Sequence, residues 1–379
     1  MKKNQNNLLK MGFFQSLGTA MIGVFFPFLV AKIFQLEIWQ VFIWLAGLNF
    51  AGISIIYPLN KILNKKISLR KTLQLGLFSI AMFYVLLAFS RENKFLIFPA
   101  TFFLVLGIYT FWPNYNFIIQ HSTKDGKRGK YLGNIQATMV GANILAPTIS
   151  GFLLQNNLEK WILGVAIICF GIGLFFLQKV KTPSYKILNF NSIWQFFSRD
   201  FVKKKIGKLT FIEGIQSGTL LTVWPIFFKS VLASFTQMGL LVSLSGIVEM
   251  ISAKFSGKIV DKKSAKKSLK FSAIIRFFDL GIRGIIYFWP TAIMAGIASF
   301  FAGFLGPVFN ISYRSRIMEI AEKNKKREWE FFIVREWVLS GMRGIIYIFA
   351  GFLVFFGGIK SLVLIIFLAA IASFGLRDS

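Results

Sequence analysis

Twelve long apolar segments, separated by short polar connections, dominate the sequence. A helix needs about 20 apolar residues to cross the ~30 Å hydrocarbon core of a bilayer. Segments of this length satisfy their own backbone hydrogen bonds inside lipid only as helices. We therefore expect an all-α polytopic membrane protein with twelve transmembrane helices. The predicted spans are residues 9–31, 38–59, 72–90, 95–119, 131–154, 161–178, 207–228, 236–256, 269–288, 290–312, 332–356 and 359–376.

The composition supports this fold class and excludes several functions. Of the 379 residues, 55% are hydrophobic, which exceeds what the core of a soluble domain of this length can bury. Cys169 and His121 are each the only residue of their type, so we expect no internal disulfide and no histidine-based metal site. The sequence has no Walker-type nucleotide loop. We expect no cofactor, and an enzyme is the least favoured class because no nucleophile–base pair is recognisable.

The distribution of positive charge predicts the topology. The formal net charge is +29, which in a soluble protein would suggest a nucleic-acid partner. Here most of the 44 Lys and Arg residues lie near the two termini and in every second connection, and the positive-inside rule then places both termini in the cytoplasm. We expect a monomer in the inner or plasma membrane whose partners are the lipid bilayer and a small molecule, not nucleic acid. The opposite connections carry only Lys32, Arg91, Lys94, Lys160, Lys229 and Lys360.

The longest connection divides the chain into two equal sets of six spans. We predict an N-terminal six-helix bundle over residues 1–178, a cytoplasmic linker over 179–206 and a C-terminal six-helix bundle over 207–379. Within the linker, Ile193, Phe197 and Phe201 recur every fourth residue beside basic residues. This spacing predicts an amphipathic helix on the inner membrane surface, and the alternative is an irregular apolar linker.

The connection between the eighth and ninth spans carries a recognisable motif. Residues 257–267 read GKIVDKKSAKK, which resembles the loop signature of the major facilitator superfamily. Residues 60–71 form a weaker counterpart in the first half, with Asn64 in the place of Asp261. Residues 127–133 and 146–151 resemble two segments of the family's fifth helix. The resemblance implies two six-helix pseudo-repeats that rock about a central cavity.

The same resemblance implies a cytoplasmic latch. Gly257 and Asp261 occupy the motif positions of a charged contact that closes one conformation. Arg335 and Glu336, near the cytoplasmic end of the eleventh span, are its predicted partners. The alternative is that the loop is an ordinary solvated charge run.

Ionisable residues inside the predicted spans are confined to the second half. Each costs about 2.5–3.5 kcal/mol at a helix centre on insertion scales, so each needs a partner or a watery cavity. We therefore expect any charge-based chemistry in the second half. Arg276, Asp279 and Arg283 lie on one stripe of the ninth span, which favours structural ion pairs over a transport role.

Glu249 is the leading candidate for a group that binds a proton or the substrate. It lies near the middle of the eighth span with apolar neighbours, and the alternative is an ion pair with Arg276 or Arg343. Glu213 and the nearby Gln216 lie on the seventh span. We expect Glu213 to be an entrance group or a helix-end acid.

The first half offers only neutral polar candidates. Gln15 lies in the first span, and Trp112, Asn114 and Asn116 lie close together in the fourth. Together with Tyr115, these fourth-span residues could form an aromatic, hydrogen-bonding wall for a ligand. The alternative is an ordinary interfacial belt and a proline kink.

These features predict a secondary active transporter that moves a small solute by alternating access, with protons as a candidate coupling ion. The alternative is a non-transporting or lipid-handling membrane protein on the same scaffold. The direction of transport and the substrate do not follow from the sequence.

Overall fold

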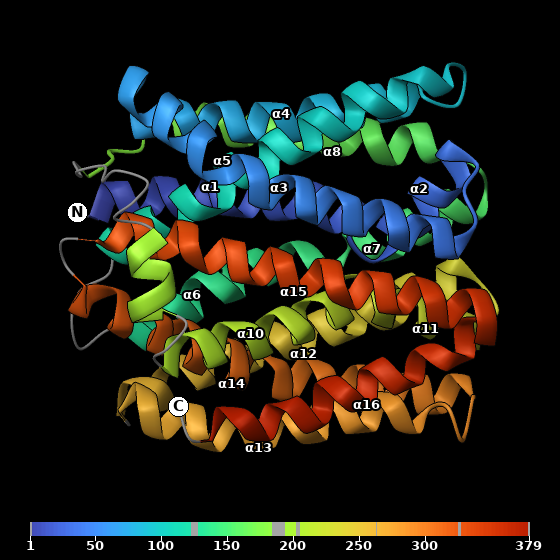
Figure 1. The fold of residues 1–379 in the computed structure, drawn as a ribbon. Helices are drawn as coiled ribbons and strands as arrows, with labels where there is room; N and C mark the ends of the chain where they lie inside the picture. Colours follow the sequence, from blue (N-terminus) through green and yellow to red (C-terminus); the bar gives the residue numbers. More distant parts are fainter. Residues whose placement is uncertain are drawn as a thin grey trace.

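The computed structural model describes residues 2–122, 128–183, 194–201, 205–262, 264–324 and 327–377. These residues form a bundle of long helices that run roughly along one axis (Figure 1). The two termini lie at the same end of this bundle, on the left in Figure 1. We call this the terminal end and the other the far end.

Each of the twelve predicted spans corresponds to a helical segment, so the predicted fold class is confirmed. Short 3-10 or π-helical turns interrupt several of these segments without ending them. The first six are α1 (Lys2–Ile22) with α2 (Phe26–Phe34), α3 (Ile38–Lys66), α4 (Leu69–Phe89), α5 (Ile97–Ser122), α6 (Arg128–Gly141) with α7 (Ala146–Gln155), and α8 (Glu159–Leu177). The second six are α10 (Lys205–Gly218) with α11 (Trp224–Val231), α12 (Phe235–Lys262), α13 (Ala265–Ile285), α14 (Ala292–Lys323), α15 (Glu328–Gly357) and α16 (Val363–Ala372) with its flanking turns η6 (Ile359–Leu362) and η7 (Ser373–Leu376).

Within the described residues, ten of these segments are long and apolar enough to cross a membrane by composition alone. The remaining two predicted spans depart from that pattern for identifiable reasons. A π-helical turn, η5 (Thr219–Val223), separates α10 from α11. The helix α13 carries Arg276, Asp279 and Arg283, all of them buried within the protein. Both departures border the site described below, and π-helical turns often accompany functional sites.

Small residues bring the two halves together along two helix pairs. Gly257 of α12 lies so close to α6 that a side chain there would meet the Gly129 carbonyl oxygen at 2.6 Å. On the other side of the bundle, Gly344 of α15 packs against the Phe50 ring of α3. Glycine has no side chain and therefore allows two helices to approach closely. Such packing matters in a membrane, where lipid offers no hydrophobic driving force for helix association. The halves are therefore tightly apposed.

The predicted linker helix is only partly covered by the structure. Residues 184–193 and 202–204, including Ile193 of the predicted stripe, lie outside the described residues. Residues 196–201 form a π-helical turn, in which Phe197 contacts Trp337 and the fully buried Phe201 contacts Phe331. This part of the segment packs on α15, and its contact with the membrane surface stays a prediction.

Candidate functional site

A cavity of about 220 Å³ lies in the second half, where η5, α11, α12, α13 and α14 surround it. Its lining combines charged side chains with aromatic and aliphatic ones, which suits a ligand with both a polar and an apolar part. One residue of the first half, Val24, also reaches it. The lining residues that bear on the argument are Glu249, Arg276, Arg283 and Trp224.

Glu249 joins the two halves at this cavity. The Gln136 amide of α6 donates a hydrogen bond of 2.9 Å to the Glu249 carboxylate of α12. The alternative ion pair with Arg343 is wrong, because the Arg343 guanidinium donates to Ser217 at 2.8 Å. Arg276 lines the same cavity but directs its guanidinium to Asp279. Glu249 is thus a half-buried carboxylate that accepts a hydrogen bond from a neutral amide.

The three charged residues of α13 form one connected group. Arg276 Nη1 lies 2.7 Å from Asp279 Oδ2, and Arg283 Nε lies 3.0 Å from Asp279 Oδ1. The guanidinium groups also lie over aromatic rings, Arg276 over Phe309 and Arg283 over Trp224. A single carboxylate therefore bridges two arginines, both of which line the cavity. Their assignment to a structural or a transport role stays a prediction.

Gln216 connects the charged residues of α13 to η7. Its side-chain oxygen accepts a hydrogen bond from Arg276 Nε at 3.3 Å. Its amide nitrogen donates to Ser373 Oγ at 2.8 Å. Gln216 is buried and links α10, α13 and η7, so it fixes the position of Arg276.

The structure corrects the predicted environment of Glu213. Both Glu213 oxygens lie 2.6 Å from Nη2 of Arg335, and Nη1 of Arg335 donates to Glu336 at 3.2 Å. Glu213 is therefore neither an entrance group nor a helix-end acid. It is a carboxylate paired across α10 and α15, beside the Tyr313 ring of α14. Arg335 and Glu336 belong to this group and not to a latch with Asp261.

Asp261 has a backbone partner in place of Arg335. Its two carboxylate oxygens accept hydrogen bonds from the N–H groups of Gly129 at 2.6 Å and Lys130 at 2.8 Å. These residues begin α6, and the first N–H groups of a helix lack partners within the helix and lie at its positive dipole end. Asp261 of the second half thus caps a helix of the first half. Gly257 permits this contact because it lies directly against Gly129.

We expect an Asp261→Asn variant to open the terminal end more often. Hydrogen bonds to charged groups contribute about 1.5–3 kcal/mol each, so loss of the charge should shift the equilibrium by about tenfold. Spin labels at Lys65→Cys and Lys323→Cys, in a Cys169→Ser background, would report a longer distance by double electron–electron resonance. A Lys262→Gln control should leave the distance unchanged. An unchanged distance in Asp261→Asn would exclude a latch role.

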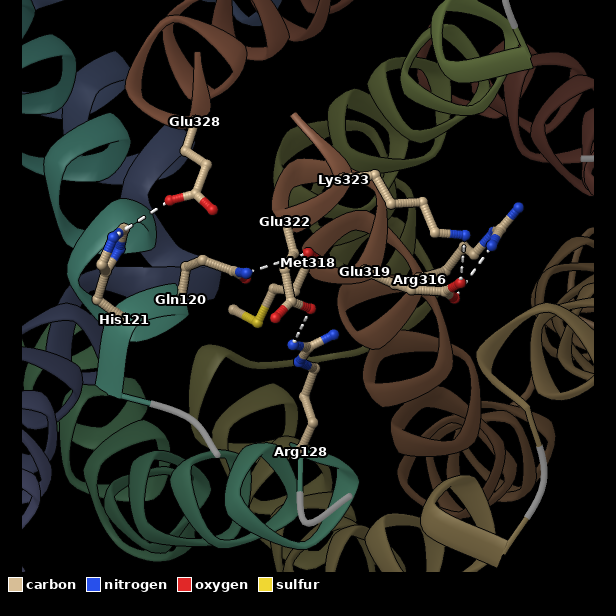
Figure 2. A network of polar contacts seen from close by, with 9 residues as sticks. All are labelled: Gln120, His121, Arg128, Arg316, Met318, Glu319, Glu322, Lys323 and Glu328. Atoms are coloured by element: carbon tan, nitrogen blue, oxygen red, sulfur yellow. Dashed lines mark hydrogen bonds and ion pairs between the residues drawn. The ribbon is translucent and has the colours of Figure 1, made fainter. Parts of the chain in front are cut away.

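A polar network missed by the sequence analysis connects the halves at the terminal end (Figure 2). His121 of α5 lies 3.2 Å from the Glu328 carboxylate, where α15 begins. Arg128 of α6 lies 2.8 Å from Glu322 of α14. The Gln120 amide donates to the backbone carbonyl of Met318 at 3.1 Å. Only the acids within the predicted tenth connection, residues 313–331, could have hinted at these contacts, because their partners lie about 200 residues away in sequence.

The polar residues predicted in the first half lie away from the cavity. The buried Asn114 amide donates to Asn60 at 2.6 Å, and Asn114 accepts from the Trp329 indole of α15 at 3.0 Å. Asn116 accepts from Arg314 at 3.5 Å. Asn114 and Asn116 therefore join the halves towards the terminal end.

The two other first-half candidates have local contacts. Trp112 packs against Phe111 and Tyr115 of its own helix. The Gln15 amide donates to Thr19, one turn along α1, at 3.1 Å. Among the described residues that line the cavity, none is Gln15, Trp112, Asn114 or Asn116, so the predicted ligand wall is not part of it.

The halves also meet at the far end. Thr148 Oγ1 of α7 and Ser243 Oγ of α12 lie 2.8 Å apart, and the Phe235 N–H donates to the Gln155 side chain at 3.0 Å. The Phe28 ring of α2 packs edge-on against Phe235. Contacts between the halves therefore exist at both ends of the bundle, with the cavity between them.

Comparison with known proteins places this geometry in context. The family model described as Major Facilitator Superfamily matches residues 8–328. The multidrug resistance protein MdtG of Proteus mirabilis is 27% identical over 212 residues, which cover 53% of this chain and 52% of that protein. A multidrug resistance efflux pump, the PmrA homolog of Lactococcus lactis, is 24% identical over 241 residues, covering 58% and 56%. The chain thus spans about half the length of these curated relatives.

Solved structures match over nearly the whole chain. The outward conformation of the transporter FucP superposes with a TM-score of 0.71 at 14% identity, covering 99% of this chain and 97% of that one. The human organic anion transporter MFSD10 gives a TM-score of 0.70 at 10% identity, covering 99% of both chains. At these identities the similarity shows a shared fold.

Proposed function

Because the chain belongs to the Major Facilitator Superfamily, a family of transporters and not of enzymes, we propose that it moves a small solute across the membrane by alternating access. The main support for this proposal is the cavity, which lies between the contacts at the terminal end and those at the far end. It holds a carboxylate and two arginines at a junction of the halves. The names of the two curated relatives, both multidrug proteins, support a small-molecule substrate.

We propose that Glu249 carries the coupling proton. An ionised carboxylate makes a stronger, charge-assisted hydrogen bond than a neutral one. Protonation of Glu249 would therefore weaken its bond to Gln136, which connects α12 of the second half to α6 of the first. A proton bound at this site would thus ease the separation of the halves.

The charges around the cavity favour an anionic or zwitterionic ligand. Arg276 and Arg283 supply two positive charges, and Asp279 and Glu249 supply two negative charges. When Glu249 is protonated, one positive charge remains uncompensated, and a ligand anion would balance it. Trp224 would contact an apolar part of such a ligand. On this basis, the proton and the anion bind together and do not compete.

The size of the cavity adds a constraint. Its volume of about 220 Å³ is smaller than typical ligand sites of roughly 300–1,000 Å³. A drug-sized ligand therefore requires the halves to separate before it binds. We further propose that the terminal end faces the cytoplasm, since the basic connections gather there.

A thermal-shift screen tests the ligand class. Purified protein would be heated with amphipathic carboxylates, phosphonates, zwitterions and quaternary ammonium compounds. We expect anions to stabilise it, by about 2.7 kcal/mol at 100 times the dissociation constant. The shift should disappear in Arg283→Gln and persist in Arg316→Gln, because Arg316 pairs with Glu319 away from the cavity. Stabilisation by quaternary ammonium compounds alone would contradict the charge argument.

A further inference from the structure

A second hollow lies at the terminal end, on the outside of the second half. It is an open groove of about 550 Å³ between the start of α13 and the last turns of the chain. We call it the basic groove. It is distinct from the transport cavity, because its α13 residues differ from Arg276 and Arg283. The residues that line it are Lys267, Lys270, Phe271, Ile274, Phe374 and Arg377.

The polarity of the basic groove changes along the bundle axis. Lys267 and Lys270 lie in the first two turns of α13, and Phe271 and Ile274 continue the same stripe one turn deeper. On the opposite wall, Phe374 belongs to η7, and Arg377 follows it towards the terminal end. The groove therefore has a cationic rim at the terminal end and an apolar floor further along.

The apolar floor is exposed to the surroundings of the protein. Phe271 is 55% exposed and Phe374 is 39% exposed. The floor continues under the surface, because the Phe277 and Phe374 rings pack with centroids 4.6 Å apart. In a membrane-spanning bundle, an outward-facing apolar surface between the two ends contacts lipid.

The cationic rim has no acid to balance it among the described residues that line the groove. Basic pockets between transmembrane helices on the cytoplasmic side bind anionic lipid head groups, because each Lys or Arg near the membrane surface attracts the negative charge of the head group. A soluble anion would use the rim but leave the aromatic floor uncovered. A phospholipid matches both the rim and the floor.

We propose that the basic groove binds an anionic phospholipid, with its phosphate at the three cations and one acyl chain along the apolar floor. Such a lipid would hold η7 against α13, which already pack together. It would also support the helix that carries Arg276 and Arg283, on which the transport cavity depends. The groove is a lipid site whether or not the transport proposal is correct.

Native mass spectrometry of the delipidated full-length protein tests this. Phosphatidylglycerol and phosphatidylcholine with identical acyl chains would be titrated separately. We expect the wild-type protein to retain phosphatidylglycerol more strongly. The triple variant Lys267→Gln, Lys270→Gln and Arg377→Gln should lose at least about tenfold in that affinity. A charge-preserving variant, with Lys267→Arg, Lys270→Arg and Arg377→Lys, should keep most of it, which separates lost binding from lost folding.

A matched control removes three exposed cations elsewhere at the terminal end: Lys65→Gln, Lys66→Gln and Lys71→Gln. This control should retain phosphatidylglycerol like the wild type. An equal loss in the control would show that only net charge matters and would overturn the proposal. Equal retention of phosphatidylcholine, or complete displacement of the lipid by glycerol phosphate, would overturn it as well, because the site would then lack head-group selectivity or acyl contact.

Discussion

The Glu249→Gln variant is expected to exchange its ligand across the membrane but to lose proton-driven accumulation. Glutamine preserves the size of the side chain and can still bond to Gln136, which lies 2.9 Å from the Glu249 carboxylate. It cannot take up a proton, so the contact between α6 and α12 no longer responds to pH. The assay uses proteoliposomes with an imposed pH gradient and the compound that stabilises the protein most in the thermal-shift screen. We expect accumulation of this compound to fall at least about tenfold, which corresponds to a loss of about 1.4 kcal/mol of coupling free energy. Exchange without a gradient should persist.

The control for this experiment is Glu319→Gln. Glu319 pairs with Arg316 and Lys323 of its own helix α14, outside the cavity (Figure 2). Glu319→Gln therefore makes the same chemical change as Glu249→Gln, but at a residue whose ion pairs lie within one helix and not between the halves. Normal accumulation by Glu249→Gln would remove Glu249 as the proton carrier. Equal loss in both variants would indicate a general effect of neutralising an acid in α12 or α14.

The Asp279→Asn variant is expected to lose much of its stability. Asp279 is 1% exposed and bridges Arg276 at 2.7 Å and Arg283 at 3.0 Å. Removal of one partner from a buried ion pair costs about 3–5 kcal/mol, because it leaves a buried charge without compensation. Here one substitution affects two arginines. Thermal denaturation in detergent, with the free energy of unfolding compared between variants, would measure the loss.

The matched comparison for Asp279→Asn is Glu92→Gln. Glu92 pairs with Lys160 at 3.0 Å, but both side chains are largely exposed. Exposed pairs contribute about 0–1 kcal/mol, so this variant should remain near wild-type stability. A loss no larger in Asp279→Asn than in Glu92→Gln would mean that water in the cavity already solvates the two arginines. The transport role of the α13 charges would then be favoured over the structural one.

The sequence predicted the fold well because the membrane imposes strict lengths. Each span needs a long apolar run, and even α13, with three buried charges, was recognisable by its apolar neighbours. The helix boundaries were less accurate, since α14 continues as a helix to Lys323, well beyond the predicted end at residue 312. Polar residues end an apolar run, but they do not end a helix.

The candidate site was less predictable because contacts between helices depend on how each helix is rotated about its own axis. Spacing within one helix identified the Arg276–Asp279–Arg283 group, whose members are neighbours on a single stripe. It could not reveal that Arg335 pairs with Glu213 across α10 and α15. The partner of Asp261 was inaccessible in principle, because backbone N–H groups are identical at every position but proline. Only the fold determines which helix N-terminus lies near Asp261.

The measurement that tests the central claim most directly is proton uptake on ligand binding by the purified protein. The strongest stabilising anion from the thermal-shift screen would be mixed with the wild type and with Glu249→Gln in weakly buffered solution containing a pH indicator. We predict uptake of about one proton per anion bound by the wild type and none by the variant, because the anion and the proton favour each other's binding. Release of protons on binding, or equal uptake by both proteins, would contradict the proposal that the cavity around Glu249 binds the anion and the proton together.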